Sequence, residues 1–424
     1  MKYTLLNILK WILKKLAQLT ILRYRPDVIA ITGSVGKTSA KETIYAVLKN
    51  YKRVRKSGGN LNNELGVPLT ILGNWPEEEL KLVSRSQPAG TKRIKKLFFW
   101  LKVILSGTLQ VIFPQRSVYP QVLILEYGAD KPGDIRNLLA IARPKIAVIT
   151  SISEIPVHIE FYSGPEAVVR EKGKLIEHLF VNDFAVLNFD DQTVIGLKER
   201  TRATLKTFGF NDGADVRIAN YETKPDGIVF KLEHQGNVVP VFLRNVFGRA
   251  QAYAAIIGVC VGLIYNINLV EISEALSANY RPAKGRMNLL AGIKDTFIID
   301  DTYNASPASM QAALETLRDL PASRKIAVLG DMLELGKYSI EAHQSIGKLT
   351  AKTADVLITV GPRGKFIAES AAAEGMPKDH ILTFDTAAEA AKEVQELIKP
   401  GDLVLIKASR AMGLEKIVEE IKEM

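Results

Sequence analysis

An eight-residue segment, TGSVGKTS at Thr32–Ser39, limits this chain to few possible folds. It follows a short run rich in β-branched residues, VIAIT (28–32), and precedes a segment with helical spacing from about Thr38 to Lys49. Glycines let the backbone wrap closely around a phosphate group, and the free N–H groups at a helix start point toward that group. The order strand, glycine loop, helix therefore predicts a nucleotide-binding loop (a P-loop) within an α/β fold.

The residues of this loop have expected roles. Lys37 would neutralise the β- and γ-phosphates of ATP, and the Thr38 hydroxyl would bind Mg²⁺. The spacing is G-x-x-G-K-T, which is shorter than the common G-x-x-x-x-G-K-T. A glycine turn with an accidental Lys-Thr pair is the alternative, and the strand–loop–helix context argues against it. The rest of the segment is expected to line the nucleotide: Thr32, Gly33, Ser34, Val35, Gly36 and Ser39.

Strand and helix patterns alternate along most of the chain after residue 27, which is typical of a doubly wound parallel sheet. Residues 214–243 instead indicate antiparallel strands, a small β excursion, and a change of composition at 280–285 marks the start of a second α/β series. We therefore expect a P-loop ATP-binding domain at 27–281 and a Rossmann-like α/β domain at 282–424. Buried strands are predicted at 122–129, 145–152, 183–189, 296–300, 324–330, 355–361 and 402–409.

The positive charge of the chain is concentrated at its N-terminal end. With 424 residues, the chain is too long for one hydrophobic core, so two or three domains are expected. Residues 1–120 contain 21 Lys+Arg and 6 Asp+Glu, or +15, while the formal charge of the whole chain is +10. This indicates an anionic partner, either a membrane surface or nucleic acid. The single cysteine, Cys260, excludes a disulfide framework and fits a reducing cytoplasm.

Two apolar segments that contain lysines lie within this basic end. Residues 4–22 have apolar residues at helical spacing with Lys10, Lys14 and Gln18 on another face, which argues against a signal peptide or a spanning helix. We expect residues 1–26 to form an amphipathic helix on a membrane surface, and a helix packed on its own domain is the alternative. The apolar residues of this helix are Leu5, Ile8, Ile12, Leu16 and Leu19.

The second segment belongs to an insert at 76–120 that interrupts the α/β pattern. A basic cluster precedes the apolar stretch 97–113. Basic residues beside Phe and Trp suit contact with a membrane surface, and a buried helical hairpin is the alternative. Nucleic-acid binding would need aromatic residues interleaved with the charges, and here they are separate, so no nucleic-acid partner is expected. The cluster comprises Lys92, Arg93, Lys95 and Lys96.

Two further residues have side chains suited to binding metal. Glu126 ends the apolar run VLILE, which would expose its carboxylate at the carboxyl edge of a parallel sheet. His158 lies just beyond the next predicted strand. Each alone is more simply explained as a surface glutamate and a core histidine. Together with the P-loop they supply the oxygen and imidazole ligands that Mg²⁺–nucleotide chemistry uses.

The chain resembles the Mur ligase family over about residues 27–424. The likeness lies in seven motifs that occur in one order, and two of them, DDTYNA and LGDMLELG, are typical of the branch that adds a terminal dipeptide. The resemblance implies ATP-dependent ligation of D-alanyl-D-alanine to a muramoyl-tripeptide-type carboxylate through an acyl phosphate, in the cytoplasm, by a monomer. The motifs are TGSVGKTS, SGGNLNNELGVPLTIL, LEYGADKPGDI, RPAKGRMN, DDTYNASPASM, LGDMLELG and LIKASRAMGLE.

The resemblance also assigns roles to single residues. Lys37 and Thr38 match residues that hold phosphate and the first Mg²⁺, with Glu126 as a further ligand. His158 matches a ligand of a second Mg²⁺, and Lys172, fourteen residues later, matches a lysine that becomes carbamylated. Asn60, Gln251, Arg286 and Asp301 match ATP-contacting positions, and the last two would close over the nucleotide. Expected next to the incoming dipeptide are Asn304, Lys407, Ser409 and Arg410.

The chain departs from the family pattern at several places. About 26 residues precede the ATP domain, where family members have a domain for the nucleotide-sugar, and the 76–120 insert is foreign to the pattern. Gln251 stands in place of an asparagine, and Ser306 replaces the second asparagine of NAN. Two alternatives therefore stay open: a Mur-type ligase for another acceptor, such as a poly-γ-glutamate-like or pseudomurein-like peptide, or a membrane-associated ATP-binding protein without ligase activity. Contact with the inner face of the membrane is a further expectation.

Overall fold

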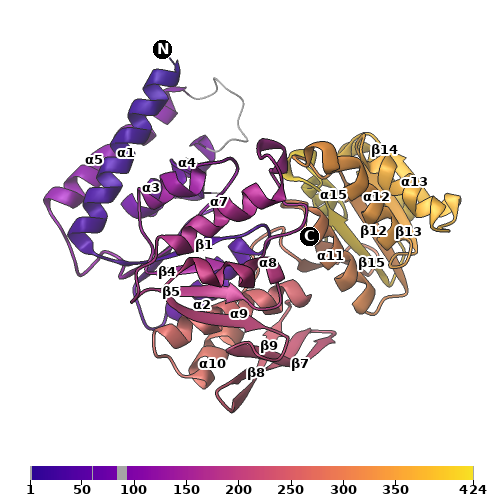
Figure 1. The fold of residues 1–424 in the computed structure, drawn as a ribbon. Helices are drawn as coiled ribbons and strands as arrows, with labels where there is room; N and C mark the ends of the chain where they lie inside the picture. Colours follow the sequence, from indigo (N-terminus) through magenta and orange to yellow (C-terminus); the bar gives the residue numbers. More distant parts are fainter. Residues whose placement is uncertain (1, 60, 84–92, 424) are drawn as a thin grey trace.

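The chain folds around two β-sheets, each with helices on both faces (Figure 1). The computed structural model describes residues 2–59, 61–83 and 93–423. Within these residues the central part of the chain forms a nine-stranded sheet, and the C-terminal part forms a six-stranded sheet, orange to yellow in Figure 1. The predicted α/β class, with a second α/β sheet following the first, is confirmed.

The first sheet has the strand order β2-β3-β1-β4-β5-β6-β7-β8-β9. Pairing is parallel from β2 to β7, whereas β8 and β9 are antiparallel. The last three strands are the predicted β excursion, which extends the same sheet. The strands are β1 (Asp27–Thr32), β2 (Val54–Lys56), β3 (Val122–Glu126), β4 (Ile146–Ile149), β5 (Phe184–Asn188), β6 (Thr204–Gly209), β7 (Val216–Lys224), β8 (Gly227–His234) and β9 (Asn237–Arg244).

Strand β1 is apolar throughout because helices cover both faces of the sheet. Ile29 and Ile31 point into one core, and Val28 and Ala30 point into the other, as the pleat requires. The first core lies under α2 (Lys37–Leu48), α9 (Arg249–Ile264) and α10 (Leu269–Asn279). The second core lies under α6 (Asp134–Leu139), α7 (Pro165–Glu177), α8 (Gln192–Ile195) and the 3₁₀ segment η2 (Gly196–Arg200).

Four helices pack together at one end of the central sheet (Figure 1), and Ala17, Val67 and Ile71 from two of them also enter its second core. A small core made of Leu13, Leu69, Leu72, Phe99 and Val103 holds them together. The predicted helix at 4–22 is confirmed, and it packs on its own domain, because Leu13 in its middle is fully buried. Part of the predicted basic cluster, Lys92, lies outside the described residues. The helices are α1 (Lys2–Tyr24), α3 (Gly66–Leu72), α4 (Glu77–Val83) and α5 (Arg93–Ile112).

The second sheet has the order β10-β11-β15-β12-β13-β14, with only β10 antiparallel to its neighbour. Its strands are β10 (Asn288–Gly292), β11 (Thr296–Asp300), β12 (Arg324–Gly330), β13 (Val356–Val360), β14 (Ile381–Phe384) and β15 (Asp402–Lys407). One face packs against α11 (Pro307–Asp319), α12 (Ser339–Thr350) and α13 (Gly364–Ala373), and the other against α14 (Ala387–Leu397) and α15 (Glu415–Ile421).

The carboxyl ends of the parallel strands are where the two sheets contribute to one site. In the first sheet, β1 lies between β3 and β4. The chain runs from β1 to β2 on one side of β1 and later crosses from β3 to β4 on the other side. Such a point of reversal is where open α/β sheets bind ligands. The loop after β12 reaches the same place, because Glu334 contacts His158 from the central part of the chain. The site therefore has walls from both sheets.

Candidate active site

The P-loop joins β1 to α2 and lies against the end of β4. Gly36, the residue before α2, has a left-handed backbone (φ 86°). A Cβ atom at Gly33 would lie 2.0 Å from Thr150 Oγ1, so no side chain fits there. Lys37 Nζ donates to the Gly33 carbonyl at 2.7 Å, which folds its ammonium group over the loop. Burial lowers the pKa of Lys37, and the nearby Glu126 carboxylate opposes this effect.

Glu126 ends β3 beside this loop, with 4% of the residue exposed. Its Oε2 accepts a hydrogen bond from Thr38 Oγ1 at 3.3 Å. Its Oε1 lies 2.7 Å from Nζ of Lys41, a lysine one helical turn after Lys37 that is almost fully buried. The carboxylate is thus held between a hydroxyl and an ammonium group at the start of α2.

The donor set at Thr38 and Glu126 fits one Mg²⁺ ion bound together with a nucleotide. Mg²⁺ in such sites keeps several waters and takes only one or two carboxylates, with phosphate oxygens completing the octahedron. Among the described residues, no group of three or more His, Cys, Asp or Glu side chains is arranged to hold a metal by itself. The Thr38 hydroxyl and the Glu126 carboxylate, which face the phosphate loop, are enough for a Mg²⁺ ion whose other ligands are waters and phosphate oxygens.

Lys172 is brought to the P-loop from α7. It is 5% exposed, and its Nζ donates at 3.1 Å to the same Gly33 carbonyl that Lys37 contacts. Burial and, to a smaller extent, the charge of Lys37 lower the pKa of Lys172 to about 7, while Asp130 and Glu171 act in the opposite direction. A lysine with this pKa has a large neutral fraction at physiological pH, which makes its amine nucleophilic.

His158 lies between two carboxylates, one from each sheet. Its backbone is left-handed (φ 67°), which turns the ring toward the site. Nδ1 lies 2.6 Å from Glu334 Oε2, and Nε2 lies 3.4 Å from Asp130 Oδ1. Burial lowers the pKa of His158, and the two carboxylates raise it. Among the described residues these side chains form no complete metal site, and the second ion expected from the sequence stays a prediction.

Two arginines of the C-terminal part are stacked on one tyrosine. The Arg286 guanidinium lies 4.0 Å from the centroid of the Tyr303 ring, and that of Arg410 lies 5.0 Å from it. Arg410 Nη1 also donates to the Tyr303 hydroxyl at 3.2 Å. Arg286 is close enough to the P-loop for its charge to lower the pKa of Lys37. This cationic wall faces the phosphate loop, where an anionic ligand would lie between them.

Asp301 and Lys407 form a buried ion pair at the ends of β11 and β15. Lys407 Nζ donates to Asp301 Oδ2 at 2.5 Å and to the Asn304 carbonyl at 2.8 Å. Burial raises the pKa of Asp301, and the Lys407 ammonium opposes that rise. Ser409 Oγ accepts from the Leu333 backbone N–H at 2.9 Å. These contacts connect the predicted dipeptide-site residues to the loop that contains Glu334.

Gln251 joins the two parts of the chain. It is 2% exposed; its Nε2 donates to the Arg286 carbonyl at 3.1 Å, and its Oε1 accepts from the Tyr280 hydroxyl. Its role toward ATP stays a prediction. Asn60, predicted near the phosphates, lies outside the described residues.

Sequence reasoning missed four residues of this site. Lys41 could have been suspected, because it lies four positions after Lys37 on a helix face that is otherwise apolar. Asp130 and Glu334 are acidic members of the motifs LEYGADK and LGDMLELG, which are themselves a signal. Tyr303 lies in the motif DDTYNA, but its role depends on stacking between arginines that are distant in sequence, and the motif alone does not indicate that role.

Two family descriptions match the chain. The Mur ligase middle domain matches residues 31–83 and 109–262, and the Mur ligase, glutamate ligase domain matches residues 285–410. UDP-N-acetylmuramoyl-tripeptide--D-alanyl-D-alanine ligase of Bacillus subtilis (strain 168) is 29% identical over 413 residues, which is 97% of this chain and 79% of the relative. The enzyme of that name from Escherichia coli (strain K12) is 27% identical over 93% of this chain and 77% of its own length.

Solved structures agree with the sequence relatives. MurF ligase from Thermotoga maritima in complex with ADP has a TM-score of 0.76 and 27% identity, covering 96% of this chain and 82% of its own. MurF from Acinetobacter baumannii has a TM-score of 0.77 and 26% identity, covering 96% and 79%. A pseudomurein peptide ligase type C from Methanothermus fervidus, at 17% identity and a TM-score of 0.64, shares the fold.

Proposed function

This chain belongs to the Mur ligase family, and we propose that it uses ATP to join D-alanyl-D-alanine to the terminal carboxylate of a muramoyl-tripeptide-type acceptor, forming ADP and phosphate. One observation supports this most directly. Lys37, Glu126 and Lys172 meet at the carboxyl edge of the first sheet, facing Arg286 and His158. The likeness to dipeptide-adding relatives over nearly the whole chain supports the choice of substrates.

The proposed reaction has two steps. An oxygen of the acceptor carboxylate bonds to the γ-phosphorus of ATP while the bond from that phosphorus to the ADP oxygen breaks, which gives an acyl phosphate and ADP. The amine of the dipeptide then attacks the acyl carbon, phosphate leaves with its bonding electron pair, and the nitrogen loses a proton. Both steps develop negative charge on phosphoryl oxygens, and fixed cations stabilise that charge.

The P-loop residues act on this charge. Lys37 and the first-turn N–H groups of α2 bind the β- and γ-phosphates, and Arg286 approaches them from the second sheet. Thr38 and Glu126 hold the Mg²⁺ ion, which when bound neutralises phosphate charge. Lys41 keeps the Glu126 carboxylate in place through their 2.7 Å contact.

Lys172 is the carbamylation site in this proposal. Its neutral amine, available because its pKa is about 7, attacks carbon dioxide and loses a proton to become a carbamate. The added carboxylate and His158 together supply ligands for a second Mg²⁺ ion. The neutral amine thereby becomes an anionic carbamate, which suits a position beside the Lys37 ammonium.

The incoming dipeptide lies against the C-terminal part. The Arg410 guanidinium, fixed by Tyr303, is suited to the dipeptide carboxylate, and Asn304 and Ser409 line the approach to the acyl carbon. Lys407 is engaged by Asp301, so its contribution is to position this wall. Asp301 and Gln251 act on ATP through Arg286 and the segments around it.

We also propose a domain organisation, an oligomeric state and a location for the protein. Residues 27–281 and 282–424 act as two domains that close over ATP, and the protein works as a monomer on cytoplasmic substrates. Among the described residues, the helices are all too short or too polar to cross a membrane. Peripheral association with the inner face of the membrane is proposed, and the exposed apolar side chains of α1 and α5 support it.

An ADP-release assay tests the proposed function. ADP should form when ATP, Mg²⁺, D-alanyl-D-alanine and a tripeptide acceptor are all present, and omission of either the dipeptide or the acceptor should stop it. UDP-linked and lipid-linked tripeptides, supplied in separate reactions, identify the carrier. Release of ADP with a different amine but not with D-alanyl-D-alanine would overturn the substrate proposal and leave the ligase class intact.

A further inference from the structure

Helices α1 and α5 expose an unusual number of large apolar side chains. In the described part of the chain, 13 of the 23 exposed large hydrophobic residues lie on these two helices. Trp11 is 61% exposed, Phe98 is 67% exposed and Leu105 is 62% exposed. At about 100 Å² for each side chain, the exposed apolar area is on the order of 1,000 Å², above the few hundred Å² usual for a soluble monomer. We call this surface the apolar face; it includes Ile8, Trp11, Leu22, Phe98, Leu105 and Ile112.

The spacing of these residues makes a continuous stripe on each helix. On α5, Phe98, Leu105 and Ile112 are separated by seven residues each, two helical turns, so they lie along one side. The opposite side of α5 is buried through Phe99 and Val103, in the same small core that buries Leu13 of α1. Because both helices turn their buried sides to that shared core, both stripes face away from it.

The polar side of α1 contributes to this arrangement. Lys10 Nζ pairs with Glu64 at 2.6 Å, and Gln18 Nε2 donates to the Ala140 carbonyl at 2.6 Å, so these polar groups turn toward the domain. A soluble helix usually does the reverse and turns its charges to water. Leaving the apolar stripe outside is therefore unfavourable in water alone, and a partner that covers it would remove that cost.

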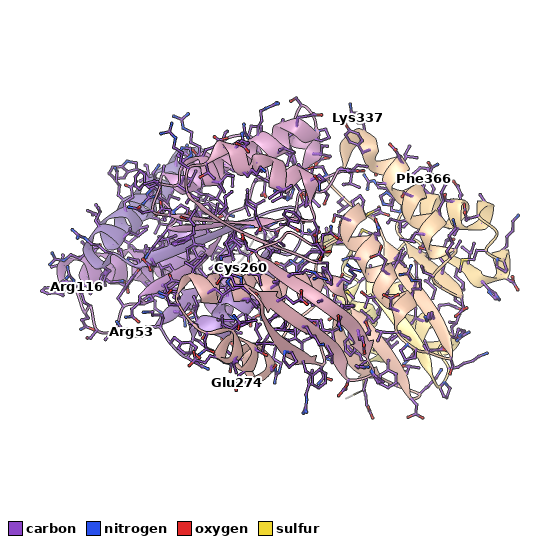
Figure 2. All side chains as sticks on the ribbon, turned by 60° about the horizontal axis from the view of Figure 1, so that its bottom comes forward. Arg53, Arg116, Cys260, Glu274, Lys337 and Phe366 are labelled. Atoms are coloured by element: carbon purple, nitrogen blue, oxygen red, sulfur yellow. The ribbon has the colours of Figure 1, made fainter. Side chains whose placement is uncertain are left out.

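The charge around the apolar face shows which partner fits. Residues 1–26 and 92–120 contain twelve Lys+Arg and no Asp or Glu. Arg53 and Arg116 lie at the end of the molecule far from Lys337 and Phe366 of the second sheet (Figure 2), where α1 and α5 end. Arg116 Nη2 donates to the Arg23 carbonyl at 3.3 Å, which ties the segment after α5 to the end of α1. Apolar burial and attraction to anionic headgroups add to each other at a membrane surface.

We propose that the apolar face of α1 and α5 docks onto a lipid bilayer rich in anionic headgroups, with both helices lying flat in the interface. The docking proposal rests on the proposed peripheral location, and it adds which surface binds the membrane and which lipid charge that surface requires. A 23-residue helix is about 35 Å long, and neither helix is apolar enough to span, so each lies along the surface. A second copy of the chain fits less well, because pairing two such faces would bring two sets of positive charges together.

The location of the face is compatible with ligation. Figure 1 shows α1 and α5 at the end of the central sheet away from the second sheet. Docking therefore leaves the carboxyl edge of the first sheet and the approach of Arg286 free. Most of this surface also lies outside the family match, which covers residues 31–83 and 109–262 of the central part. The face is thus an addition to the catalytic framework.

Vesicle flotation of the full chain tests the proposal. The protein should float with vesicles of phosphatidylcholine containing roughly 30% phosphatidylglycerol at about 50 mM salt, and less at about 500 mM salt. Vesicles of phosphatidylcholine alone should bind it several-fold less. The double variant Phe98→Glu/Leu105→Glu, at two exposed positions that the core does not use, should lower binding at least tenfold. Val270→Glu, an exposed apolar position on α10, is the matched control and should bind like the wild type.

ADP release and light scattering on the same samples separate the outcomes. The double variant should release ADP at the wild-type rate with a soluble acceptor, which shows that it is folded and that loss of vesicle binding is specific. Equal binding by the wild type and the double variant would overturn the proposal, as would failure of the wild type to float at low salt. A dimer that dissociates in the double variant, without vesicle binding by the wild type, would instead assign the face to a second copy. Loss of ADP release in every protein would count against the proposed function only.

Discussion

Replacing Lys41 with methionine should destabilise the central domain strongly in the absence of nucleotide. The Lys41 and Glu126 side chains are 2% and 5% exposed, and their charged atoms are 2.7 Å apart. Methionine keeps most of the side-chain volume but removes the ammonium, which leaves the buried Glu126 carboxylate without its cation. Removing one partner of a buried pair costs about 3–5 kcal/mol.

Mg–ADP should restore part of this loss. Glu126 Oε2 also faces Thr38 Oγ1 at 3.3 Å, which is the position we propose for the Mg²⁺ ion. A divalent cation bound there would compensate the carboxylate that the variant leaves unpaired. The difference in stability between the variant and the wild type should therefore shrink when Mg–ADP is added, and ADP with a chelator should not produce this effect.

Thermal unfolding followed by circular dichroism measures both effects. A loss of about 4 kcal/mol corresponds to a fall in Tm of roughly 8–16 °C for a domain of this size. Lys56→Met is the matched control, since Lys56 pairs with Glu42 but is 31% exposed, and a partly solvated pair contributes about 1 kcal/mol or less. The assignment of Lys41 and Glu126 as a buried pair beside the Mg²⁺ position is wrong if Lys41→Met lowers Tm no more than Lys56→Met. It is also wrong if Mg–ADP leaves the difference in Tm between Lys41→Met and the wild type unchanged.

Three further predictions follow from single side chains. Lys37→Ala should abolish ADP release while circular dichroism remains that of the wild type; near-normal turnover would remove the P-loop assignment. Lys172→Ala should lose most activity and regain part of it with added short carboxylates, and a free Lys172 amine in the mass spectrum of active, metal-loaded enzyme would contradict carbamylation. Burial lowers the pKa of His343 below its usual value of about 6.5, so the unfolded state binds more protons at acid pH and stability should fall as the pH drops below about 6.5. His343→Gln should flatten that fall in Tm between about pH 7 and pH 5.5, and an unchanged slope would assign it to other groups.

Apart from the antiparallel strands of the β excursion, the strands that were predicted from sequence are largely buried on both faces. β1 and β12 each have long apolar runs because helices cover both sides of their sheets, and such runs stand out from the surrounding sequence. β2 is only three residues long, VRK, at the edge of its sheet, and β14 is a partly exposed edge strand. β2 has no apolar run, and the Ile-Leu-Thr-Phe of β14 is too short to stand out, so pairing with a neighbour decides their structure and neither strand was predicted.

The orientation of α1 could not be predicted for a related reason. The predicted apolar set divides in the structure, where Leu5, Ile8 and Leu19 are exposed and Leu16 packs on the small core. Which side faces the protein depends on partners distant in sequence, since Lys10 pairs with Glu64 and Gln18 bonds to Ala140. The helix pattern alone fits a membrane surface or a packed helix, and the structure shows packing on one side with an exposed apolar stripe on the other.

The catalytic site likewise has one part that local sequence predicts and another part that depends on residues distant in sequence. The P-loop is local, since one strand, four loop residues and one helix fix the position of Lys37, and sequence therefore indicated it directly. The wall opposite it is assembled from Arg286, Tyr303 and Arg410, which span more than a hundred residues of chain. Only the family resemblance pointed to the two arginines, and Tyr303 lay in the DDTYNA motif without an assigned role.

The connection between α1 and β1 bears on how docking and ligation would coexist. Tyr24 ends α1 and Asp27 begins β1, so the membrane-facing helix leads directly into the strand whose other end starts the P-loop. A protein held by α1 and α5 would therefore keep the P-loop at a fixed position relative to the bilayer. The second sheet is joined to it around Tyr280 and Gln251 and contacts it through His158 and Glu334. In the proposed closure, movement of the second sheet alone would open the site, so docking through α1 and α5 would not have to be broken in each turnover.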